Sequence, residues 1–562
     1  MEIRRISLIA PKPTVPLGAS HYLVMLFWGL PLIGTILKER GYEVRVFFEI
    51  VKPIDWEFVY SSQAVCFQTL ACTANRTFEF IRRIKANNPG AVTVIGGTLP
   101  TAVPEDMLKR CDFVVRQEGD ESLPDLLDAL QRGHDLRTVP GISYKVDETE
   151  YIHTPDRPMV ANIDTIPDLS LVHGWKELNR WKLLLRGKMQ MHVVQTSRGC
   201  PYACSFCIVP MMYNAHTYRV RSIDSVITEI KTKIDESDCR RFMFVDNYFG
   251  GYREHAKKLL RRIIAEGLQF RCFAFCRLEI YKDPEFLGLL KQANFDPLFI
   301  GFESFNDSTL QSFEKHQTAK RIIESIKVIK EHDLRISGSF IIGSDDDTVE
   351  TIRQSMDAAR RNGIDNINIF PLSAMPTRKP GVVPRRRMIL LDYDFGSGNH
   401  VTIFPKQMKP STLQKEYIRA YRLFNNPGRA LDAVRNGNLQ AGVERLFAAL
   451  AHREIIADIE KRYLPRLYEI EQGYYDANER LIEERLPPDG IINREAILVP
   501  EEESPYDVNL QHDPDMLLLL GDNGHHAHPP SSGMISQDAV SEMVRKHTLD
   551  MALRKCYGNL LS

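Results

Sequence analysis

The sequence lacks the features of a membrane-spanning or secreted protein. Nowhere in its 562 residues is there a run of about 18 apolar residues, the length that a transmembrane helix requires. The most apolar early stretch, residues 22–32, is broken by Gly29 and Pro31. The opening letters, MEIRRISLIAP, contain an apolar run that is too short for a signal peptide and is typical of a first buried strand. These absences predict a cytoplasmic protein without a transmembrane segment.

The chain also has almost no net charge. Its 72 basic residues face 73 acidic residues, and the formal net charge is −1. Nucleic-acid binders usually carry a basic excess or stripe, so the composition disfavours nucleic acid as a partner. The apolar share of 43% and the charged share of 26% are those of a globular protein, and the length allows about three or four domains.

Cysteine is sparse, with ten residues in the whole chain. Without a secretion signal, so few cysteines do not indicate a disulfide framework. Three of them, Cys200, Cys204 and Cys207, lie within one short segment, which indicates a metal site. We interpret the other cysteines as small core residues.

Residues 1–135 alternate between strand-like and helical patterns. The stretch 30–40 is helical and is stopped by Gly41, and residues 42–48 are rich in strand-forming residues. Strands that alternate with helices at this spacing predict an α/β protein with a parallel sheet. We expect an N-terminal doubly wound, Rossmann-like domain, which binds ligands at the carboxyl ends of its strands.

The alternation resumes over residues 191–410. Six strand candidates separated by helices predict a partial (β/α)6 TIM-like barrel rather than a closed eight-stranded one. Functional residues of such barrels concentrate at the carboxyl ends of the strands. The predicted strands are residues 192–196, 242–246, 271–275, 298–302, 336–342 and 366–370, and the predicted helices are residues 222–234, 252–265, 284–292, 319–331 and 348–362.

Two flanking segments have less regular patterns. Residues 136–190 predict a connector, in which 141–144 and 150–153 pair as a hairpin before a proline-rich stretch. Residues 411–562 predict a helical C-terminal region. Within it, a segment of about 486–533, rich in Pro, acid and His, predicts poor order, and a last helix is expected over about 537–557.

The clustered cysteines follow directly on a predicted strand that ends at Thr196. The local sequence is SRGCPYACSFC, with the spacing C-x3-C-x2-C. Three thiolates on one loop are suited to holding three irons of a cubane Fe–S cluster. The fourth iron then stays open to a chelating ligand, as a catalytic zinc keeps an open position. The alternative is a zinc knuckle, but no fourth Cys or His lies nearby at a matching spacing.

This cysteine motif, opening a barrel of six repeats, resembles the radical S-adenosylmethionine (radical SAM) superfamily over residues of about 191–410. The resemblance implies a [4Fe–4S] cluster on the three cysteines, with SAM chelating the open iron. Reduction by a low-potential donor such as a flavodoxin or ferredoxin would then cleave SAM to a 5′-deoxyadenosyl radical. In such enzymes the cofactors carry the chemistry and the protein aims it.

The resemblance also implies SAM contacts at the strand ends. The segment FVDN, with Asp246 and Asn247, resembles the one that binds the SAM amino group, although no Gly-Gly-Glu occurs. The alternative for each position is an ordinary strand-end or core residue. The remaining candidates are Phe206 beside the adenine, Arg277 for the carboxylate, Glu303 with Ser304 for the ribose or amino group, and residues 336–343 supporting the adenine.

A doubly wound domain ahead of the barrel, and the letters YRVRS after the cysteine loop, are similar to the cobalamin-binding class of these enzymes. The Asp-x-His-x-x-Gly signature that supplies a cobalt ligand is absent, and His21 lacks the glycine that should follow. The resemblance therefore implies cobalamin without a protein histidine, or a domain that kept the fold and lost the cofactor. The loops concerned contain Thr69, Thr73, Gly96, Gly97, Thr98, Glu118 and Gly119.

Two weaker features remain. Cys272 and Cys276 share one face of a strand, and near the barrel mouth Cys276 is a candidate catalytic hydrogen-atom donor, although core filling is the simpler interpretation. The run GHHAH at residues 524–528 is a candidate metal site, with a solvated tail as the alternative.

These observations favour a cobalamin-dependent radical SAM enzyme that methylates an unactivated carbon. A second hypothesis is a ring-forming, C–C coupling or oxidoreductase enzyme of the same superfamily, with or without cobalamin. A third, of another class, is a non-catalytic Fe–S or corrinoid-binding sensor. An RNA methylthiotransferase is disfavoured because a second cysteine cluster is missing. The substrate stays open between a lipid, a tetrapyrrole, a peptide and a small metabolite.

Overall fold

A computed structural model describes residues 2–16, 23–147, 149–178, 183, 188–373, 383–435 and 439–492. The chain divides into two compact units. The first comprises Met1–Phe424 with Ala451–Ile497, and the second comprises Asn425–Leu450 with Leu498–Ser562. None of the described helices is both long enough and apolar enough to cross a membrane.

The N-terminal sheet is parallel through its first five strands. Its order is β3-β1-β4-β5-β6-β7-β8. The order of the strands therefore reverses between β1 and β4, as it does in doubly wound folds. The antiparallel pair β7–β8 closes one edge and confirms the hairpin predicted from the connector. The strands are β1 (Arg5–Ala10), β3 (Glu43–Phe48), β4 (Ala64–Gln68), β5 (Val92–Gly96), β6 (Phe113–Val115), β7 (Ile142–Lys145) and β8 (Tyr151–His153).

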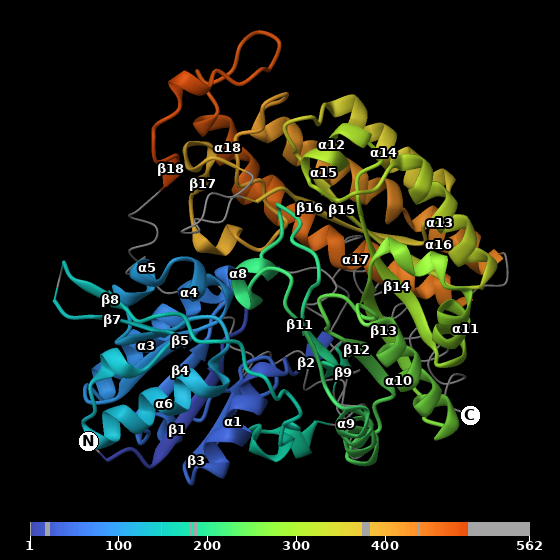
Figure 1. The fold of residues 1–562 in the computed structure, drawn as a ribbon. Coiled ribbons are helices and arrows are strands. Elements are labelled where there is room, and N and C mark those ends of the chain that lie inside the picture. Colours follow the sequence, from blue (N-terminus) through green and yellow to red (C-terminus); the bar gives the residue numbers. More distant parts are fainter. Residues whose placement is uncertain are drawn as a thin grey trace, which may run out of the picture. The chain divides into compact units, whose positions relative to one another are not determined.

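Helices cover both faces of this sheet, which explains why its strands are apolar on both sides. Helices α1 (Gly29–Glu39) and α6 (Gly119–Arg132) lie over one face of the sheet (Figure 1). Apolar side chains of both helices belong to the hydrophobic core on that face. Side chains of α2 (Trp56–Tyr60) and α3 (Ala74–Asn87) pack on the other, with those of the short helices α4 (Thr98–Ala102) and α5 (Pro104–Leu108). The Rossmann-like domain predicted from the sequence is confirmed.

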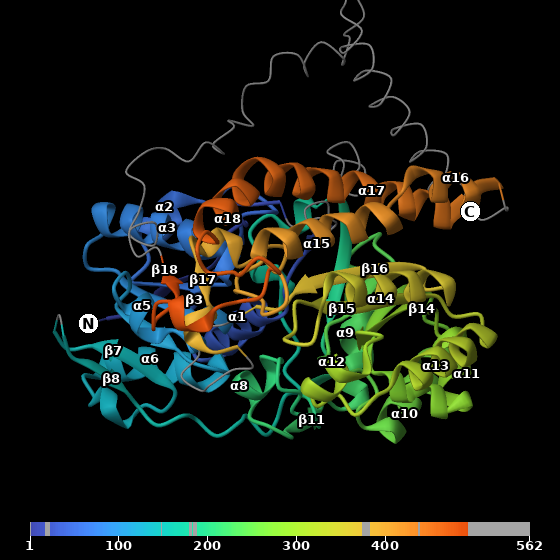
Figure 2. The same cartoon turned by 90° about the horizontal axis from the view of Figure 1, so that it is seen from above.

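The second sheet is entirely parallel and contains all six strands predicted for the barrel. Its order is β16-β15-β14-β13-β12-β9-β2, with β16 and β2 as the two edges, so the barrel is open. Helices connect the successive barrel strands (Figure 2). The strands are β2 (Leu23–Met25), β9 (Met189–Val194), β12 (Arg241–Phe244), β13 (Arg271–Cys276), β14 (Phe295–Glu303), β15 (Ile336–Ile342) and β16 (Asn366–Pro371), and the helices are α9 (Ile223–Asp235), α10 (Arg253–Ala265), α11 (Pro284–Gln292), α13 (Ala319–Glu331) and α14 (Val349–Arg361).

Strand β2 links the two sheets in a way that the sequence pattern did not indicate. It belongs to the N-terminal segment but pairs with β9 of the barrel, Leu23 opposite Met189. Only three residues form it, and so short a run has no detectable period. The first 135 residues thus supply five of the seven strands of the Rossmann-like sheet and also one edge strand of the barrel.

The barrel sheet packs its outer face against the helices. On β13, the side chains of Cys272, Ala274 and Cys276 belong to the large hydrophobic core that also contains residues of α10 and α11. The alternating Phe273 and Phe275 are half-buried on the opposite face, where both rings approach Phe299. The inner face of the barrel is therefore lined in part by aromatic rings.

Beyond residue 410 the described chain is mostly helical, as predicted. The helices are α15 (Pro410–Phe424), α16 (Pro427–Arg435), α17 (Leu439–Asp458) and α18 (Leu464–Ile470). The short strands β17 (Ile389–Leu390) and β18 (Ile491–Ile492) form a parallel pair. Most of the tail predicted to be poorly ordered, the last predicted helix, the GHHAH run and His21 lie outside the described residues.

Candidate functional site

A two-stranded antiparallel ribbon closes the cysteine loop at its base. Strands β10 (Ser197–Gly199) and β11 (Tyr218–Val220) pair with Gly199 opposite Tyr218. Gly199 has a φ of +86°, and a Cβ at this position would lie 2.1 Å from the carbonyl oxygen of Thr217. Because no side chain fits there, the glycine is required for the two stems to meet.

The three cysteines project from this loop as free, half-buried thiols. The backbone N–H of Cys207 donates to the carbonyl of Cys204 at 3.0 Å, which fixes a tight turn between two of the ligands. In the described part of the chain no three His, Cys, Asp or Glu side chains converge to hold a single metal ion. A cubane cluster needs no such convergence, since each thiolate binds a different iron, and a soft three-thiolate donor set fits it.

Two buried cations flank the thiols. Nη1 of Arg277 donates to Sγ of Cys204 at 3.4 Å. Burial raises the pKa of the Cys207 thiol to about 11, against the opposing positive charge of Lys315. Burial also raises the pKa of the Cys200 thiol, against the charges of Arg277 and Lys315. The cations thus offset part of the negative charge that three bound thiolates bring together.

Two contacts hold the Arg277 side chain in place. Its guanidinium lies 3.7 Å from the ring centroid of Tyr202, within the cysteine loop, and its Nε donates to Glu279 at 3.3 Å. These contacts direct it to Cys204. The predicted role of Arg277 toward the SAM carboxylate stays a prediction, and its observed partner is a cluster ligand.

Glu303 and Lys315 form a buried ion pair at the end of β14. Nζ of Lys315 donates to Oε1 of Glu303 at 2.6 Å, and both side chains are less than a tenth exposed. Lys315 also lies 5.9 Å from the ring centroid of Phe206, the aromatic residue between the second and third cysteines. The fold therefore brings Glu303, a predicted SAM ligand, beside the cysteine loop through a lysine.

Glu303 is held in a strained backbone conformation. Its φ is +65°, which is unusual for a residue other than glycine. A Cβ at Gly301 would lie 2.5 Å from Oε1 of Glu303, so the glycine leaves room for the carboxylate. Ser304 is buried, and its hydroxyl accepts from the backbone N–H of Asn306. Strain that the surroundings maintain is often found at ligand sites.

Asp246 fastens the start of the cysteine loop. Its Oδ1 accepts hydrogen bonds from the backbone N–H and hydroxyl of Thr196 and from the hydroxyl of Ser197. Its Oδ2 is buried and has no hydrogen-bond partner among the described residues, and burial raises the pKa of Asp246 to about 6. Asn247 is exposed. Both residues were predicted to bind the SAM amino group. The side chain of Asn247 is accessible to such a ligand, whereas that of Asp246 holds Thr196 and Ser197 in place.

Cys276 does not line the inner face of the barrel. It is 5% exposed and belongs to the core between the sheet and the helices. Burial raises the pKa of its thiol to about 12. Its role as a hydrogen-atom donor stays a prediction that these contacts do not favour, whereas the simpler interpretation, core filling, accounts for them.

The predicted cobalamin loops lie together at the carboxyl edge of the first sheet. Gly97 has a φ of +121°, and a Cβ there would lie 2.7 Å from the carbonyl of Thr69. The hydroxyl of Thr69 bonds to that of Thr77, and the hydroxyl of Thr73 bonds to the backbone of Leu70. Gly97 thus allows the loop after β5 to pack closely against the loop after β4. Thr98 is only half-buried at the start of α4.

Gly119 lies against helix α1, and Glu118 points to the two-stranded ribbon. A Cβ at Gly119 would lie 3.1 Å from the Ile33 side chain, so the glycine allows α1 and α6 to pack closely. The carboxylate of Glu118 accepts from Arg198 and Arg219 on the ribbon. Burial alone would raise the pKa of Glu118, but the hydrogen bonds and charges of these arginines hold it below its usual value. Its contacts do not support a direct role in cobalamin binding.

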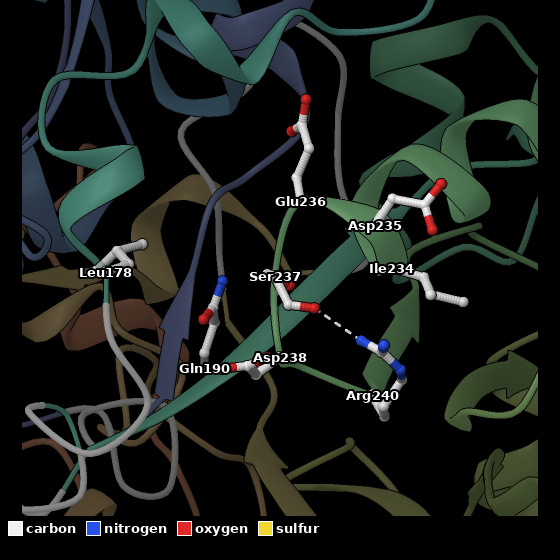
Figure 3. A pocket seen from close by; sticks show the side chains of 8 residues that line it. All are labelled: Leu178, Gln190, Ile234, Asp235, Glu236, Ser237, Asp238 and Arg240. Atoms are coloured by element: carbon white, nitrogen blue, oxygen red, sulfur yellow. Dashed lines mark hydrogen bonds between the residues drawn. The ribbon is translucent and has the colours of Figure 1, made fainter.

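A separate polar cavity of about 400 Å³ lies at the end of the barrel strands that is opposite to the cysteine loop. Figure 3 shows its wall, in which the guanidinium of Arg240 donates to the backbone of Ser237 beside the end of α9. In the barrel the carboxyl ends of the strands carry the cysteine loop, and this cavity is at the amino ends. We assign no function to it. Its lining residues are Leu178, Gln190, Ile234, Asp235, Glu236, Ser237, Asp238 and Arg240.

Comparison with known families agrees with this geometry. Residues 194–359, which contain the cysteine loop and most of the barrel, match the family described as the Radical SAM superfamily. This chain carries a radical SAM domain. A domain of this kind implies a [4Fe–4S] cluster and SAM as cofactors, which is the pair predicted from the cysteine motif.

Curated relatives extend the likeness beyond the radical SAM domain. An uncharacterized methyltransferase of Pyrococcus horikoshii is 30% identical over 281 residues, or 50% of this chain and 60% of the relative. The anaerobic magnesium-protoporphyrin IX monomethyl ester cyclase of Rubrivivax gelatinosus is 25% identical over 51% of each chain. The bacteriochlorophyllide d C-12(1)-methyltransferase of Chlorobaculum tepidum is 25% identical over 74% of this chain and 86% of its own. The alignments with the first two relatives thus span only between half and two thirds of those proteins.

Two solved structures are similar in fold to about two thirds of this chain. The methyltransferase TsrM from Kitasatospora setae has a TM-score of 0.54 and 20% identity, covering 67% of this chain and 73% of its own. The radical enzyme OxsB has a TM-score of 0.55 and 17% identity, covering 65% of this chain and 53% of its own. At these identities the comparison establishes the fold.

Sequence reasoning missed three residues of the radical SAM site. Lys315 follows the short helix α12 (Asp307–Ser312) and had no motif around it. Arg198 and Arg219 flank the cysteines within the quoted letters SRGC and YRVRS, but no partner for them was evident. The available signal was an arginine on each side of the clustered cysteines, Arg198 before Cys200 and Arg219 after Cys207, because buried charges require counter-ions.

Proposed function

We propose that this protein is a cobalamin-dependent radical SAM enzyme that methylates an unactivated carbon atom. The observation that carries the proposal is the union, in one compact unit, of a three-thiolate loop and a doubly wound domain. The likeness to TsrM and OxsB supports it, because TsrM was solved with cobalamin bound and OxsB is a cobalamin-dependent radical enzyme. The names of the Pyrococcus and Chlorobaculum relatives support methyl transfer.

The residues divide the tasks as follows. Cys200, Cys204 and Cys207 would hold the cluster, and Arg277 with Lys315 would offset its negative charge. Asn247 would accept from the SAM amino group, Glu303 from its amino group or ribose, and the backbone beside Phe206 would contact the adenine. When bound, these cofactors supply a 5′-deoxyadenosyl radical and a methyl group.

Cobalamin would bind at the carboxyl ends of the strands of the first sheet, next to the neighbouring strands β1 and β4, where the strand order reverses. Thr98 and the backbone around Gly96 and Gly97 are the candidates for contact there. Because the sequence lacks the histidine signature, we expect cobalt without a protein imidazole. The hydroxyls of Thr69 and Thr73 already form hydrogen bonds within the protein, to Thr77 and Leu70. These two residues would therefore support the loops around cobalamin without contacting it.

The test is cobalamin uptake by protein purified anaerobically with an intact cluster. We expect about one cobalamin per chain, with an absorbance spectrum that lacks imidazole ligation. Thr98→Trp should reduce uptake without changing iron content, whereas any side chain at Gly97 would first disturb the loops themselves. Absence of uptake by wild-type protein that still cleaves SAM would contradict the cobalamin proposal.

A second candidate is oxidative ring formation, favoured by the cyclase name of the Rubrivivax relative. SAM labelled in its methyl group separates the two functions. Methyl transfer places the label in the product, and ring formation leaves it in methionine. The substrate itself stays open between the lipid, tetrapyrrole, peptide and small-metabolite classes.

The cellular setting is also part of the proposal. A low-potential electron donor such as a flavodoxin or ferredoxin would reduce the cluster, which favours a cytoplasmic location. The test is whether a purified, reduced flavodoxin reduces the bound cluster. The reduction is measured as the decrease in the absorbance of the cluster. A cluster that only a chemical reductant can reach would contradict the proposed donor class.

A further inference from the structure

Two buried arginines face each other across the ribbon that closes the cysteine loop. Arg198 on β10 lies directly opposite Arg219 on β11. Their side chains are 5% and 15% exposed. Like charges directly opposite one another destabilise an antiparallel pair, and burial strengthens the repulsion because water screens it less. The ribbon therefore requires a counter-charge to stay closed.

Glu118 supplies that charge from the other domain. Its Oε1 accepts from Nη1 of Arg198 at 2.8 Å and from Nη2 of Arg219 at 2.9 Å. Its Oε2 accepts from Nη1 of Arg219 and from the backbone N–H of Val160, both at 2.9 Å. Asp120 pairs with Arg198 alone, at 2.8 Å. Glu118 is thus the one group among the described residues that these contacts show joined to both arginines.

The position of Glu118 gives this contact a wider consequence. It is the N-cap residue of α6, at the carboxyl end of β6 in the Rossmann-like domain. The ribbon that it holds ends at Gly199, immediately before Cys200. Hydrogen bonds to charged groups in such buried sites are strong and directional. One carboxylate thereby connects the first domain to both stems of the cysteine loop.

We propose that Glu118 is a positioning residue for the Fe–S cluster: it clamps both stems of the cysteine loop through Arg198 and Arg219, and so sets the place of the cluster relative to the N-terminal domain. The inference needs the cluster but neither cobalamin nor a substrate. It also accounts for Arg219, the first of the two arginines in the letters YRVRS.

Hydrogen exchange of residues 197–221 in the full-length, cluster-loaded protein tests the clamp. Glu118→Gln should raise exchange in this segment by about tenfold or more, speed the loss of iron, and alter the EPR signal of the reduced cluster with SAM. The matched control is Glu121→Gln, also in the first turn of α6, whose carboxylate pairs with Arg157 instead. The control should resemble wild type in all three measurements.

A second variant separates the clamp from a general loss of structure. In Glu118→Gln/Arg219→Gln the unopposed like charge is gone, so exchange should fall back toward wild type. If Glu118→Gln alone yields no folded protein, recovery of folded protein by the second substitution supports the clamp, and failure to recover overturns it. Exchange and an EPR signal equal to wild type in Glu118→Gln would also overturn it. None of these readouts depends on cobalamin, so a negative cobalamin result leaves them unaffected.

Discussion

Nη1 of Arg277 lies 3.4 Å from Sγ of Cys204, so a guanidinium contacts a predicted cluster ligand directly. Tyr202 stacks on one side of that guanidinium, and Glu279 accepts from its Nε. Although burial opposes a charged guanidinium, Glu279 and Cys204 hold the pKa of Arg277 above its usual value. A fixed positive charge beside one thiolate favours the more negative, reduced state of the cluster.

Arg277→Met should therefore lower the midpoint potential of the cluster. The reason is that the reduced cluster loses the positive charge that stabilises it more than it stabilises the oxidised form. The measurement is a potentiometric titration followed by EPR, with iron content matched between proteins.

Glu279→Gln provides the opposite control. Removing the carboxylate leaves the Arg277 charge less compensated, so the midpoint potential should rise. A shift in the same direction for both variants would show that altered packing, and not charge, determines the potential.

Glu303→Gln should weaken SAM binding and also destabilise the protein. Loss of a charge-assisted hydrogen bond to SAM predicts an affinity reduced about tenfold or more. Leaving the buried Lys315 without its partner should lower the free energy of unfolding by about 3–5 kcal/mol. Equilibrium binding of SAM and urea unfolding measure the two effects separately.

The double variant Glu303→Gln/Lys315→Met distinguishes these roles. It removes the unpaired charge, so stability should recover while SAM affinity stays low. Unchanged SAM affinity in Glu303→Gln would mean that the acid only neutralises Lys315, and the predicted SAM contact would be wrong.

Local patterns account for what could be predicted. The cysteine loop was evident because its ligands lie within a few residues of each other, and the six barrel strands were evident from apolar runs separated by helical periods. Strand β15 begins and ends at the predicted residues Ile336 and Ile342. Each of these signals is contained in one short window of the chain.

Contacts between distant segments could not be predicted in this way. Glu118 was assigned to a ligand loop because it follows a strand, yet its partners come from the ribbon around the cysteines. Lys315 reaches Glu303 only because the turn after α12 folds back over β14. Strand β2 has too few residues to show a period, so the edge of the barrel was missed.

Acid should destabilise the protein through His400. This side chain is 1% exposed and packs against the rings of Phe395 and Tyr463. Within the part of the chain that the structure describes, its Nε2 has no hydrogen-bond partner. Burial lowers the pKa of His400 to about 3. In the unfolded chain this imidazole binds a proton with a pKa of about 6.5, whereas in the folded chain it stays neutral down to about pH 3. The neutral, buried His400 therefore costs no stability above about pH 6.5, and the protein loses stability as the pH falls from there toward 3.

The measurement is the free energy of unfolding of wild type and His400→Phe at pH 7.5 and 5.5. The loss between the two pH values should be smaller in the variant by about 1.4 kcal/mol. His192, whose pKa burial also lowers to about 3, should keep the remaining acid sensitivity. The control is His134→Phe at an exposed position. A pH dependence of His400→Phe identical to wild type would contradict the assignment.

The central claim is that a cluster on Cys200, Cys204 and Cys207 cleaves SAM. The most direct measurement is 5′-deoxyadenosine formed from SAM by the reduced, anaerobic protein, compared with the variant in which all three cysteines are alanine. We predict formation by wild type, which would also exclude a non-catalytic sensor, and no formation above background by the variant, which should lack the iron. Equal 5′-deoxyadenosine from both proteins would contradict the claim.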